Sequence, residues 1–280
     1  MDGEYQGSTP SDDPEYLLGT GSDELDRLRF QHEVWRETTE ALWRRAGFTT
    51  GQRLLDLGCG PGTASIDLAR IVGPGGQVIA VDESERFLAT LEAESRRLEL
   101  RWITPLKTEV EGLDLPPGSI DGAYARWLLC FLPEPSEVVR RVARALRPGG
   151  VFVVVDYFNY LATTLAPRCA PFDRALRAVA ESWRRSDGDL DIGSSLPGIF
   201  LADGLEIREI RTVARTARPG EPFWEWVERF FRGYAPRLRE MGLLTVEEVE
   251  ALLDAWRQRA ENPASFLYVP PMLELIGVRP

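Results

Sequence analysis

The feature that most constrains this chain is a glycine-rich segment between an apolar strand and a helix. Residues 53–57 are predicted to form a short buried strand and residues 63–71 the following helix, with Gly58, Gly60 and Gly62 between them. Glycine permits positive φ angles and lets the backbone approach a ligand without a Cβ clash. The helix N-terminus that follows offers unpaired N–H groups to a polar or negative group. The segment therefore predicts a ligand-binding turn in an α/β sheet.

An acidic residue at the end of the next predicted strand narrows the kind of ligand. Asp82 follows the apolar run 78–81 and stands twenty residues after Gly62. An acid at this place can accept hydrogen bonds from ribose hydroxyls, as in dinucleotide sites. The two features together indicate a bound nucleoside, although a tight connection without any ligand is the alternative. The glycine spacing is G-x-G-x-G and not the G-x-G-x-x-G of dinucleotide sites. The part of the ligand beyond the ribose is therefore either a pyrophosphate or an amino-acid tail.

Strands and helices alternate along most of the chain. Further strands are predicted at residues 78–81, 100–103, 120–125, 151–155, 205–216 and 272–278, and further helices at 85–98, 135–146, 171–185, 196–202, 222–241 and 245–260. Strands separated by helices imply right-handed βαβ units. The fold class expected is α/β, with a doubly wound, mostly parallel sheet and helices on both faces.

The domain organisation expected is one α/β domain with helical additions. Residues 1–14 are rich in Gly, Ser, Pro and acid and are predicted to be a disordered tail. Residues 15–47 are predicted to form a helical lid, whose helix starts at Ser22, contains a break and ends before Gly47. Residues 48–280 form the main domain, with helical insertions near 160–203 and 218–262. The insertions are interpreted as a cap on that domain.

Composition excludes several classes of function. The 280 residues include 33 Lys and Arg against 44 Asp and Glu, a formal net charge of −11, which argues against a nucleic-acid partner. His32 is the only histidine, so a multi-histidine metal site or a Ser-His-Asp triad would depend on it alone. No metal site is predicted, and the charge balance favours a neutral or cationic small molecule as partner.

Cysteine usage and hydropathy favour a particular cellular location. The three cysteines are widely spaced, odd in number and without a CxxC pair, which favours a reducing environment without disulfides. No apolar run approaches the roughly 20 residues of a membrane span. The acidic N-terminus is unlike a signal peptide. A cytoplasmic protein with no membrane association is expected.

Several segments resemble the class I S-adenosylmethionine-dependent methyltransferases. Residues 56–62, Asp-Leu-Gly-Cys-Gly-Pro-Gly, resemble their glycine-rich signature, and Asp82 their ribose-binding acid. Residues 121–127 resemble the fourth strand and the segment beside the reacting methyl group, and residues 146–150 the turn before the fifth strand. These motifs cover about residues 51–156; residues 16–19 and 27–31 resemble one bacterial small-molecule subgroup. The resemblance implies a seven-stranded sheet whose last strand is antiparallel, and S-adenosylmethionine as the cofactor.

The resemblance also implies a set of cofactor-binding residues. These are Tyr16, Gln31, Asp56, Gly58, Cys59, Gly60, Gly62, Asp82, Glu83, Glu109, Val110 and Arg126. The family usually has Gly-Asp-Ala where this chain has Thr108-Glu109-Val110, so the side chain facing the adenine amino group is one methylene longer. The chain lacks the Asn/Asp-Pro-Pro-Tyr motif of relatives that methylate nucleobase or glutamine amino groups.

Methyl transfer from a sulfonium needs few titratable residues. The reaction is an in-line displacement in which alignment within a dry site supplies much of the catalysis. A base is required only when the acceptor must lose a proton. His32, Asp156 and Tyr157 are the candidate catalytic residues, each with ordinary packing or solvent exposure as the alternative. The stripe formed by Phe223, Trp226, Phe230 and Tyr234 fits a core helix, or else the wall of an apolar acceptor pocket.

The function expected is S-adenosylmethionine-dependent methyl transfer to a small organic acceptor, at oxygen or nitrogen. A nicotinamide-dependent oxidoreductase would use the same strand–turn–helix unit and is one alternative. A non-catalytic nucleoside-binding protein is the other. A monomer or a homodimer is expected, and the sequence does not choose between them.

Overall fold

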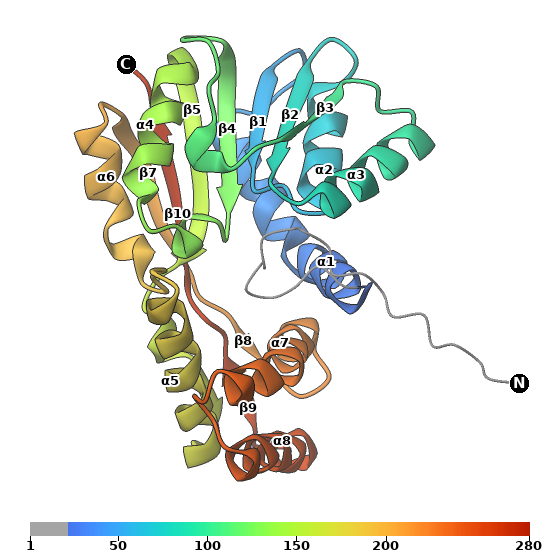
Figure 1. The fold of residues 1–280 in the computed structure, drawn as a ribbon, viewed down its shortest axis with the longest axis vertical. Helices are drawn as coiled ribbons and strands as arrows, with labels where there is room; N and C mark the ends of the chain where they lie inside the picture. Colours follow the sequence, from blue (N-terminus) through green and yellow to red (C-terminus); the bar gives the residue numbers. More distant parts are fainter. Residues whose placement is uncertain (1–21) are drawn as a thin grey trace, which may run out of the picture.

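The centre of the molecule is a twisted seven-stranded sheet, shown in Figure 1 by a computed structural model that describes residues 22–280. The strands are β1 (Arg53–Leu57), β2 (Gln77–Asp82), β3 (Ile103–Lys107), β4 (Ile120–Arg126), β5 (Leu146–Tyr157), β7 (Glu206–Val213) and β10 (Met272–Val278). Their order is β3-β2-β1-β4-β5-β10-β7. Strand β10 runs antiparallel to both of its neighbours, while β1–β5 are mutually parallel. The predicted fold class, including the antiparallel last strand, is confirmed.

Both faces of the sheet are covered by helices and buried. Because successive side chains of a strand point to opposite sides, neighbouring residues belong to different cores. Leu54 of β1 packs in the core under α1 (Ser22–Ala46) and α2 (Thr63–Val72), whereas the next residue, Leu55, packs in a second core under α4 (Pro135–Ala145) and α6 (Leu196–Ala202). Residues 151–155 of β5 divide in the same way. A continuous apolar run is therefore what a central strand of this sheet requires.

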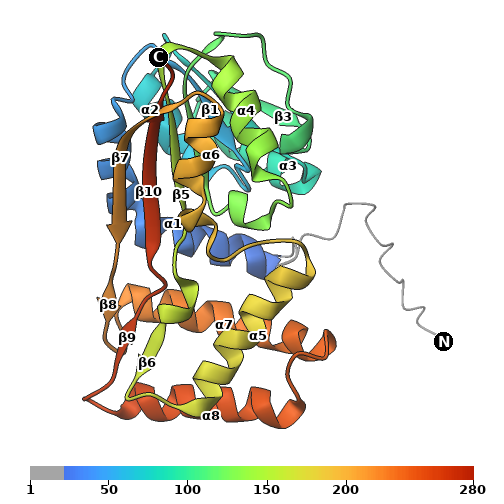
Figure 2. The same cartoon turned by 90° about the vertical axis from the view of Figure 1, so that its left-hand side faces the viewer.

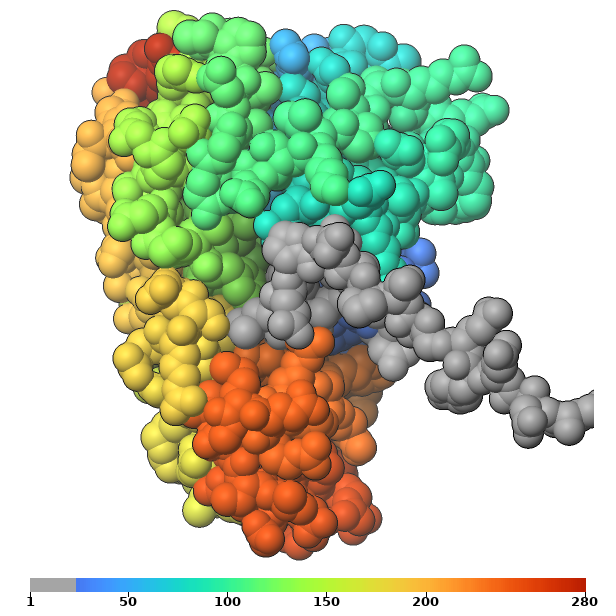
Figure 3. All heavy atoms as spheres, viewed as in Figure 1, coloured from blue at the N-terminus to red at the C-terminus, as the bar shows by residue number. Residues whose placement is uncertain are grey.

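Most of the remaining helices and the short strands form a second layer below the carboxyl edge of the sheet (Figure 2). This layer contains α5 (Ala170–Arg185), α7 (Pro222–Glu240), α8 (Val246–Glu261) and the three-stranded sheet of β6 (Thr164–Ala166), β9 (Phe266–Tyr268) and β8 (Thr216–Ala217). Helix α3 (Glu85–Arg97) does not belong to it and lies against β2 and β3 of the central sheet. Short 3-10 turns occupy Val110–Gly112, Leu129–Phe131, Tyr160–Ala162 and Ile192–Ser194. In Figure 3 the orange part, which contains α7 and α8, packs beside the yellow part, which contains α5.

Three sequence predictions need correction, and one small sheet was not predicted. The third strand lies at Ile103–Lys107 and not at 100–103, because it is an edge strand that tolerates Pro105 and an exposed, mixed sequence. The predicted strand 205–216 is divided into β7 and β8, which belong to different sheets. The three-stranded sheet was not predicted. Helix α1 is continuous from Ser22 to Ala46, without the expected break.

The predictions for the N-terminal part of the chain concern the end of its first helix, the tail and the lid. Gly47 follows α1 with a φ of 82°, as expected for a residue that ends a helix. The predicted tail 1–14 and the start of the predicted lid at residue 15 lie outside the described residues. Among residues 22–280, no helix is both long and apolar enough to span a bilayer.

Candidate active site at the carboxyl edge of the sheet

A pocket of about 470 Å³ follows the carboxyl ends of the parallel strands. Ligands of open α/β sheets bind at this edge, and the volume lies within the usual range of roughly 300–1,000 Å³ for small-molecule sites. The strand order sets the order of its lining. Glu109 after β3 and Asp82 at the end of β2 lie toward one end, and Tyr157 at the end of β5 lies toward the other.

The glycine turn forms the middle of the pocket wall. Gly60 has a φ of 55°, and no atom lies within 4 Å of the position that a Cβ would take. Its backbone N–H donates to Oδ2 of Asp82 at 2.7 Å. Gly62, with a φ of 82°, instead faces Leu91, and a Cβ at this glycine would lie only 2.2 Å from Cδ1 of that leucine. Gly60 therefore leaves space for a ligand, whereas Gly62 allows α3 to pack against the turn.

Asp82 is held in a fixed orientation by the backbone. Its Oδ1 accepts from the N–H of Ser84 at 2.9 Å, and its Oδ2 accepts from Gly60. Burial raises the pKa of the Asp82 carboxyl above its usual value, and these backbone hydrogen bonds oppose the shift. Each oxygen retains a further lone pair. The carboxylate is thus prepared to accept hydrogen bonds from a pair of hydroxyl groups.

Asp56 lies under the glycine turn and is only 2% exposed. Its Oδ2 accepts a hydrogen bond from Oγ of Ser65 at 2.5 Å. Burial raises the pKa of Asp56 to about 7, against the influence of the Ser65 hydrogen bond and the charge of Arg126. This carboxyl group can therefore change its charge near neutral pH while it faces the pocket.

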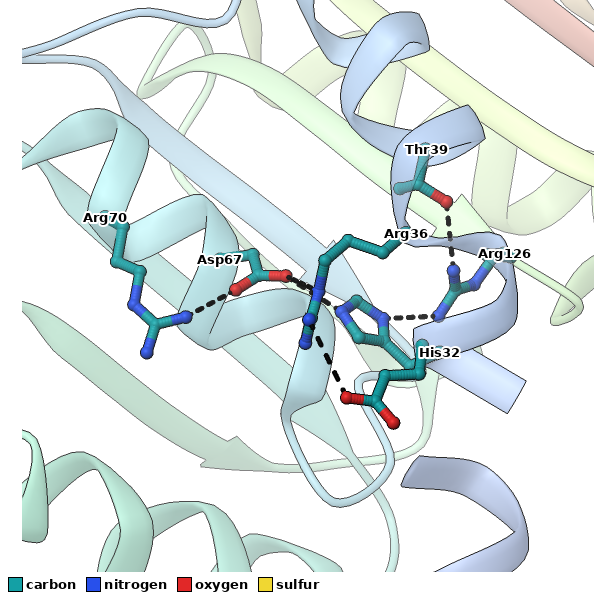
Figure 4. Close-up of polar contacts among 7 residues, drawn as sticks. His32, Arg36, Thr39, Asp67, Arg70 and Arg126 are labelled. Atoms are coloured by element: carbon teal, nitrogen blue, oxygen red, sulfur yellow. Dashed lines mark hydrogen bonds and ion pairs between the residues drawn. The ribbon is translucent and has the colours of Figure 1, made fainter. Parts of the chain in front are cut away.

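The ring of His32 lies behind the pocket wall, in the network shown in Figure 4. Its Nε2 is 2.9 Å from Oδ2 of Asp67 in α2, and its Nδ1 is 3.0 Å from Nη2 of Arg126. The other terminal nitrogen of Arg126, Nη1, donates to Oγ1 of Thr39 at 3.0 Å. Arg126 lines the pocket, but His32 does not. The histidine is 1% exposed, and both of its nitrogens are engaged.

Aromatic side chains enclose the end of the pocket beyond Arg126. Trp127 stacks on Trp226, with ring centroids 5.8 Å apart, and on Tyr157, at 6.5 Å. Tyr160 contacts Tyr157 edge to face at 5.2 Å. The same end is also lined by Leu128, Phe131, Trp183, Val227, Phe230 and Pro270. This end offers an apolar surface on which a flat ligand can stack.

The backbone of Trp127 is strained in a way that points its ring at this end. Its φ of 50° lies in the left-handed region, which is rare for a bulky residue. The conformation is held by the backbone N–H, which donates to the carbonyl of Val155 at 2.9 Å, and by Nε1, which lies 3.1 Å from Sδ of Met272. Strained residues of this kind concentrate at functional sites.

Comparison with known proteins finds similarity to methyltransferases. Residues 55–154 match the family described as "Methyltransferase domain". The demethylmenaquinone methyltransferase of Lactococcus lactis subsp. lactis is 34% identical over 126 residues, which cover 45% of this chain and 49% of that protein. Residues 55–154 therefore carry a similarity to a methyltransferase domain. The first curated relatives are matched over half of their own length or less.

Two further comparisons extend over most of the chain. The 27-O-demethylrifamycin SV methyltransferase of Amycolatopsis mediterranei is 27% identical over 268 residues, 87% of this chain and 90% of that protein. The solved structure of YcgJ from Bacillus subtilis has a TM-score of 0.60 at 19% identity and covers 87% of this chain and 98% of that one. The [4+2]-cyclase SpnF has a TM-score of 0.58 at 20% identity, over 87% of this chain and 81% of the other. The structural neighbours establish the fold.

The pocket fits S-adenosylmethionine, the cofactor that the sequence resemblance implies. The open space beside Gly60, the backbone-held carboxylate of Asp82 and the adjacent Glu109 form a cradle for a nucleoside. Arg126 supplies a positive charge further along the same wall. At Gly60 this space is open, since no atom lies within 4 Å of the position that a Cβ would take.

Most predicted cofactor residues line the pocket. They are Gln31, Asp56, Gly58, Cys59, Gly60, Asp82, Glu83, Glu109, Val110 and Arg126. Gly62 is absent from the lining because its role is to admit Leu91. Tyr16 lies outside the described residues. The roles of all these residues toward a cofactor stay predictions.

The structure separates the three candidate catalytic residues. Tyr157 lines the pocket. Asp156 does not: it is fully buried, and its carboxylate accepts from the backbone N–H groups of Cys130 at 3.2 Å and Tyr157 at 2.9 Å. His32 is likewise buried away from the pocket surface. The prediction that Asp156 or His32 acts as a base facing the acceptor is not supported by this geometry, because neither side chain reaches the pocket.

Sequence reasoning missed several residues of the pocket. Tyr160 and Trp183 are contributed by a 3-10 turn and by α5, which lie beyond the resembling residues 51–156. Arg27 and Leu28, one helical turn before Gln31, line the pocket from α1. Residues three and four positions before Gln31 share its face of the helix, so the helical period would have predicted Arg27 and Leu28 as pocket residues. Nothing in the local sequence marks Tyr160 or Trp183.

Proposed function

We propose that this chain transfers a methyl group from S-adenosylmethionine to a small, largely apolar acceptor, at oxygen or nitrogen. The observation that carries the proposal is the continuity of one pocket, which joins the nucleoside cradle at β1–β3 to the aromatic end at β4, β5 and α7. A donor held in the cradle and an acceptor stacked on the aromatic rings would meet near Arg126 and Trp127. Alignment of two reactants in one pocket is what a displacement reaction requires.

The aromatic end favours an acceptor with a flat or ring-bearing apolar body. Tryptophan and tyrosine rings provide large stacking surfaces, and their packing excludes water. Relatives named for demethylmenaquinone, 2-phytyl-1,4-naphtoquinone and 27-O-demethylrifamycin SV support a ring-bearing acceptor, since each name describes such a molecule.

Phenol groups are the polar groups best placed to orient that acceptor. Tyr160 is 5% exposed and lines the pocket, and no described residue is hydrogen-bonded to its hydroxyl group. Burial raises the pKa of both Tyr157 and Tyr160 well above the usual value of a phenol. Both groups therefore stay protonated near neutral pH and act as hydrogen-bond donors. A carbonyl or hydroxyl oxygen of the acceptor is a suitable partner.

No general base faces the acceptor at the aromatic end among residues 22–280. The pocket residues contributed by β5, α5 and α7 include no carboxylate and no histidine. When bound, S-adenosylmethionine supplies an electrophilic methyl group, so an acceptor with an available lone pair can react without proton removal. The side chains of this chain bind, orient and desolvate the reactants. An amine fits this arrangement, and so does a hydroxyl group that is acidic enough to ionise without a base.

Turnover is the experiment that tests the proposal. The protein is incubated with methyl-labelled S-adenosylmethionine and a panel of ring-bearing phenols, quinols and amines, and labelled product is measured. We expect label transfer to at least one member, with S-adenosylhomocysteine formed in equal amount. Cofactor binding without transfer to any acceptor would favour the non-catalytic alternative. Turnover must be measured because SpnF, a cyclase, has a similar fold.

A nicotinamide-dependent oxidoreductase, the other alternative, has no support from the matched family or from the relatives above. The net charge of −11 supports a partner other than nucleic acid. A cytoplasmic location and a monomeric or homodimeric state remain part of the proposal.

A further inference from the structure

Arg126 occupies a central place in the charge pattern of the pocket. It ends β4, between the glycine turn after β1 and the aromatic residues after β5. Five acidic residues line the pocket, whereas the basic residues of the described lining are Arg27 and Arg126. Arg27 donates to both carboxylate oxygens of Glu24, at 2.7 and 2.6 Å. Arg126 has no such carboxylate partner among the described residues.

The hydrogen bonds of Arg126 determine the tautomer of His32. An arginine N–H group can only donate, so Nδ1 of His32 must accept from Nη2 of Arg126 at 3.0 Å. Nε2 then carries the proton and donates to Oδ2 of Asp67 at 2.9 Å. Figure 4 shows the ring between these two partners. The arrangement requires a neutral ring, and burial lowers the pKa of His32, which favours that form.

Two anchors hold the guanidinium while other N–H groups stay available. Nη1 of Arg126 donates to Thr39 and Nη2 to His32, which uses two of the five N–H groups of the side chain. The guanidinium also lies 4.8 Å from the centre of the Trp127 ring. A planar guanidinium fixed in this way is suited to bind a carboxylate through two N–H groups.

We propose that Arg126 binds the carboxylate of the amino-acid part of the cofactor, and that His32 is a positioning residue that holds the guanidinium at the pocket. The identity of the ligand rests on the function proposed above. S-adenosylmethionine carries a single carboxylate, attached beyond the ribose, and the strand order places Arg126 beyond the ribose-binding Asp82 in the direction of the acceptor. The only histidine of the chain thus serves the cofactor and not the acceptor.

The charge of His32 makes carboxylate binding at Arg126 depend on pH. Charged groups face His32 from three elements: Asp67 from α2, Arg126 from β4 and Arg36 from α1; Arg70 in turn donates to Asp67. Protonation of His32 removes the acceptor for Arg126 and places a second cation 3.0 Å from the guanidinium. Affinity for the carboxylate should therefore be constant at high pH and fall as the pH decreases below 6.5, the ordinary pKa of His32.

A pair of ligands tests the carboxylate site without measuring activity. S-adenosylhomocysteine contains the amino-acid part, whereas 5′-methylthioadenosine has the same nucleoside and thioether without it. Calorimetric titration of Arg126→Gln should show at least about a 10-fold loss of affinity for S-adenosylhomocysteine, as expected for a lost charged hydrogen bond. Affinity for methylthioadenosine should change less than about 3-fold. Arg70→Gln is the matched control, because Arg70 shares Asp67 but does not line the pocket.

His32→Asn tests the positioning role. The asparagine amide can still present an oxygen near the position of Nδ1, but it cannot titrate. At pH 8 we expect the affinity of this variant for S-adenosylhomocysteine to be within a few-fold of the parent. Between pH 8 and pH 5 its affinity should lack the decrease that titration of His32 causes in the parent. Any pH dependence that remains in this variant belongs to Asp56, whose pKa is raised to about 7. Thermal unfolding of each variant verifies that it is folded.

The outcomes separate this inference from the proposed function. If neither ligand binds the parent protein, the proposed function fails. If both bind, and Arg126→Gln weakens them equally or not at all, the carboxylate site is wrong and the proposed function is unaffected. If His32→Asn keeps the full pH dependence of the parent, the positioning role of His32 is wrong. The inference is upheld by selective loss in Arg126→Gln together with a flattened pH profile in His32→Asn.

Discussion

Single residues at the pocket have roles that their chemistry alone does not reveal. His32 was a candidate base because its ordinary pKa lies near neutrality. In the structure both of its nitrogens are engaged by residues 35 and 94 positions away along the chain, Asp67 and Arg126. Such partners depend on the folded arrangement of α1, α2 and β4. Asp82, by contrast, could be predicted, because its place after β2 and the glycine turn are encoded locally.

Tyr160→Phe tests the role of the phenol at the aromatic end. The substitution removes a donor that no described residue satisfies and preserves the ring that packs against Tyr157. We expect stability and S-adenosylhomocysteine affinity to remain within about twofold of the parent, because no hydrogen bond to a described residue is lost. KM for an oxygen-bearing acceptor should rise about 3- to 10-fold, the effect of one hydrogen bond. Steady-state kinetics on the acceptor found in the turnover screen provides the measurement; an unchanged KM would remove Tyr160 from acceptor binding.

At the scale of elements, continuous apolar runs predicted the buried strands well, whereas the edge strand was predicted poorly. Val78–Val81 lies within β2 because a central strand needs a continuous apolar run. Strand β3 contains Thr104, Pro105 and Lys107, and only its pairing with β2 defines it as a strand. The pairs β6–β9 and β8–β9 were missed for a similar reason: they are two or three residues long and join distant segments.

The glycines of the turn provide a matched pair of substitutions. In Gly62→Ala the new Cβ meets Leu91 in a left-handed backbone, so we expect a loss of roughly 2–4 kcal/mol of stability from overpacking and strain. Gly60→Ala has the same strain but open space, so its stability loss should be about 1–2 kcal/mol. Its added methyl group enters the space assigned to the cofactor, and S-adenosylhomocysteine affinity should fall at least about 10-fold.

Denaturant unfolding and calorimetric titration of the two proteins separate these effects. If Gly60→Ala binds S-adenosylhomocysteine as tightly as the parent, the space beside Gly60 is not the cofactor cradle. If Gly62→Ala is no less stable than Gly60→Ala, the contact with Leu91 does not limit packing between the turn and α3.

Over the whole molecule, Arg45 joins α1 to the β10–β7 edge of the sheet by two ion pairs. Arg45 near the end of α1 donates to Glu209 of β7 at 2.8 Å and to Glu274 of β10. Glu274 is only 2% exposed. Burial raises the pKa of Glu274, and Arg45 opposes this shift. These contacts join residues separated by 164 and 229 positions, so no local sequence pattern predicts them.

Arg45→Met should therefore destabilise the protein strongly, and in a pH-dependent manner. Removal of the cation leaves a buried carboxylate without its counter-charge, which costs about 3–5 kcal/mol. A carboxyl whose folded pKa is raised regains stability as the pH falls and it becomes protonated. The deficit relative to the parent should thus be larger at pH 8 than at pH 5. Denaturant unfolding at both values measures it, and Arg45→Met/Glu274→Gln should recover part of the loss at pH 8. An equal deficit at both pH values would contradict the assignment.

The measurement that bears most directly on the pocket as an S-adenosylmethionine site is calorimetric titration with S-adenosylhomocysteine. We expect one site per chain in the parent protein, and a loss of about 1.5–3 kcal/mol of binding free energy in Asp82→Ala, since Asp82 bonds the ribose as a charged acceptor. Methylthioadenosine should show the same loss in this variant, because it carries the same ribose. No binding to the parent at high micromolar concentration, or equal affinity of Asp82→Ala and parent, would contradict the assignment of this pocket to the cofactor.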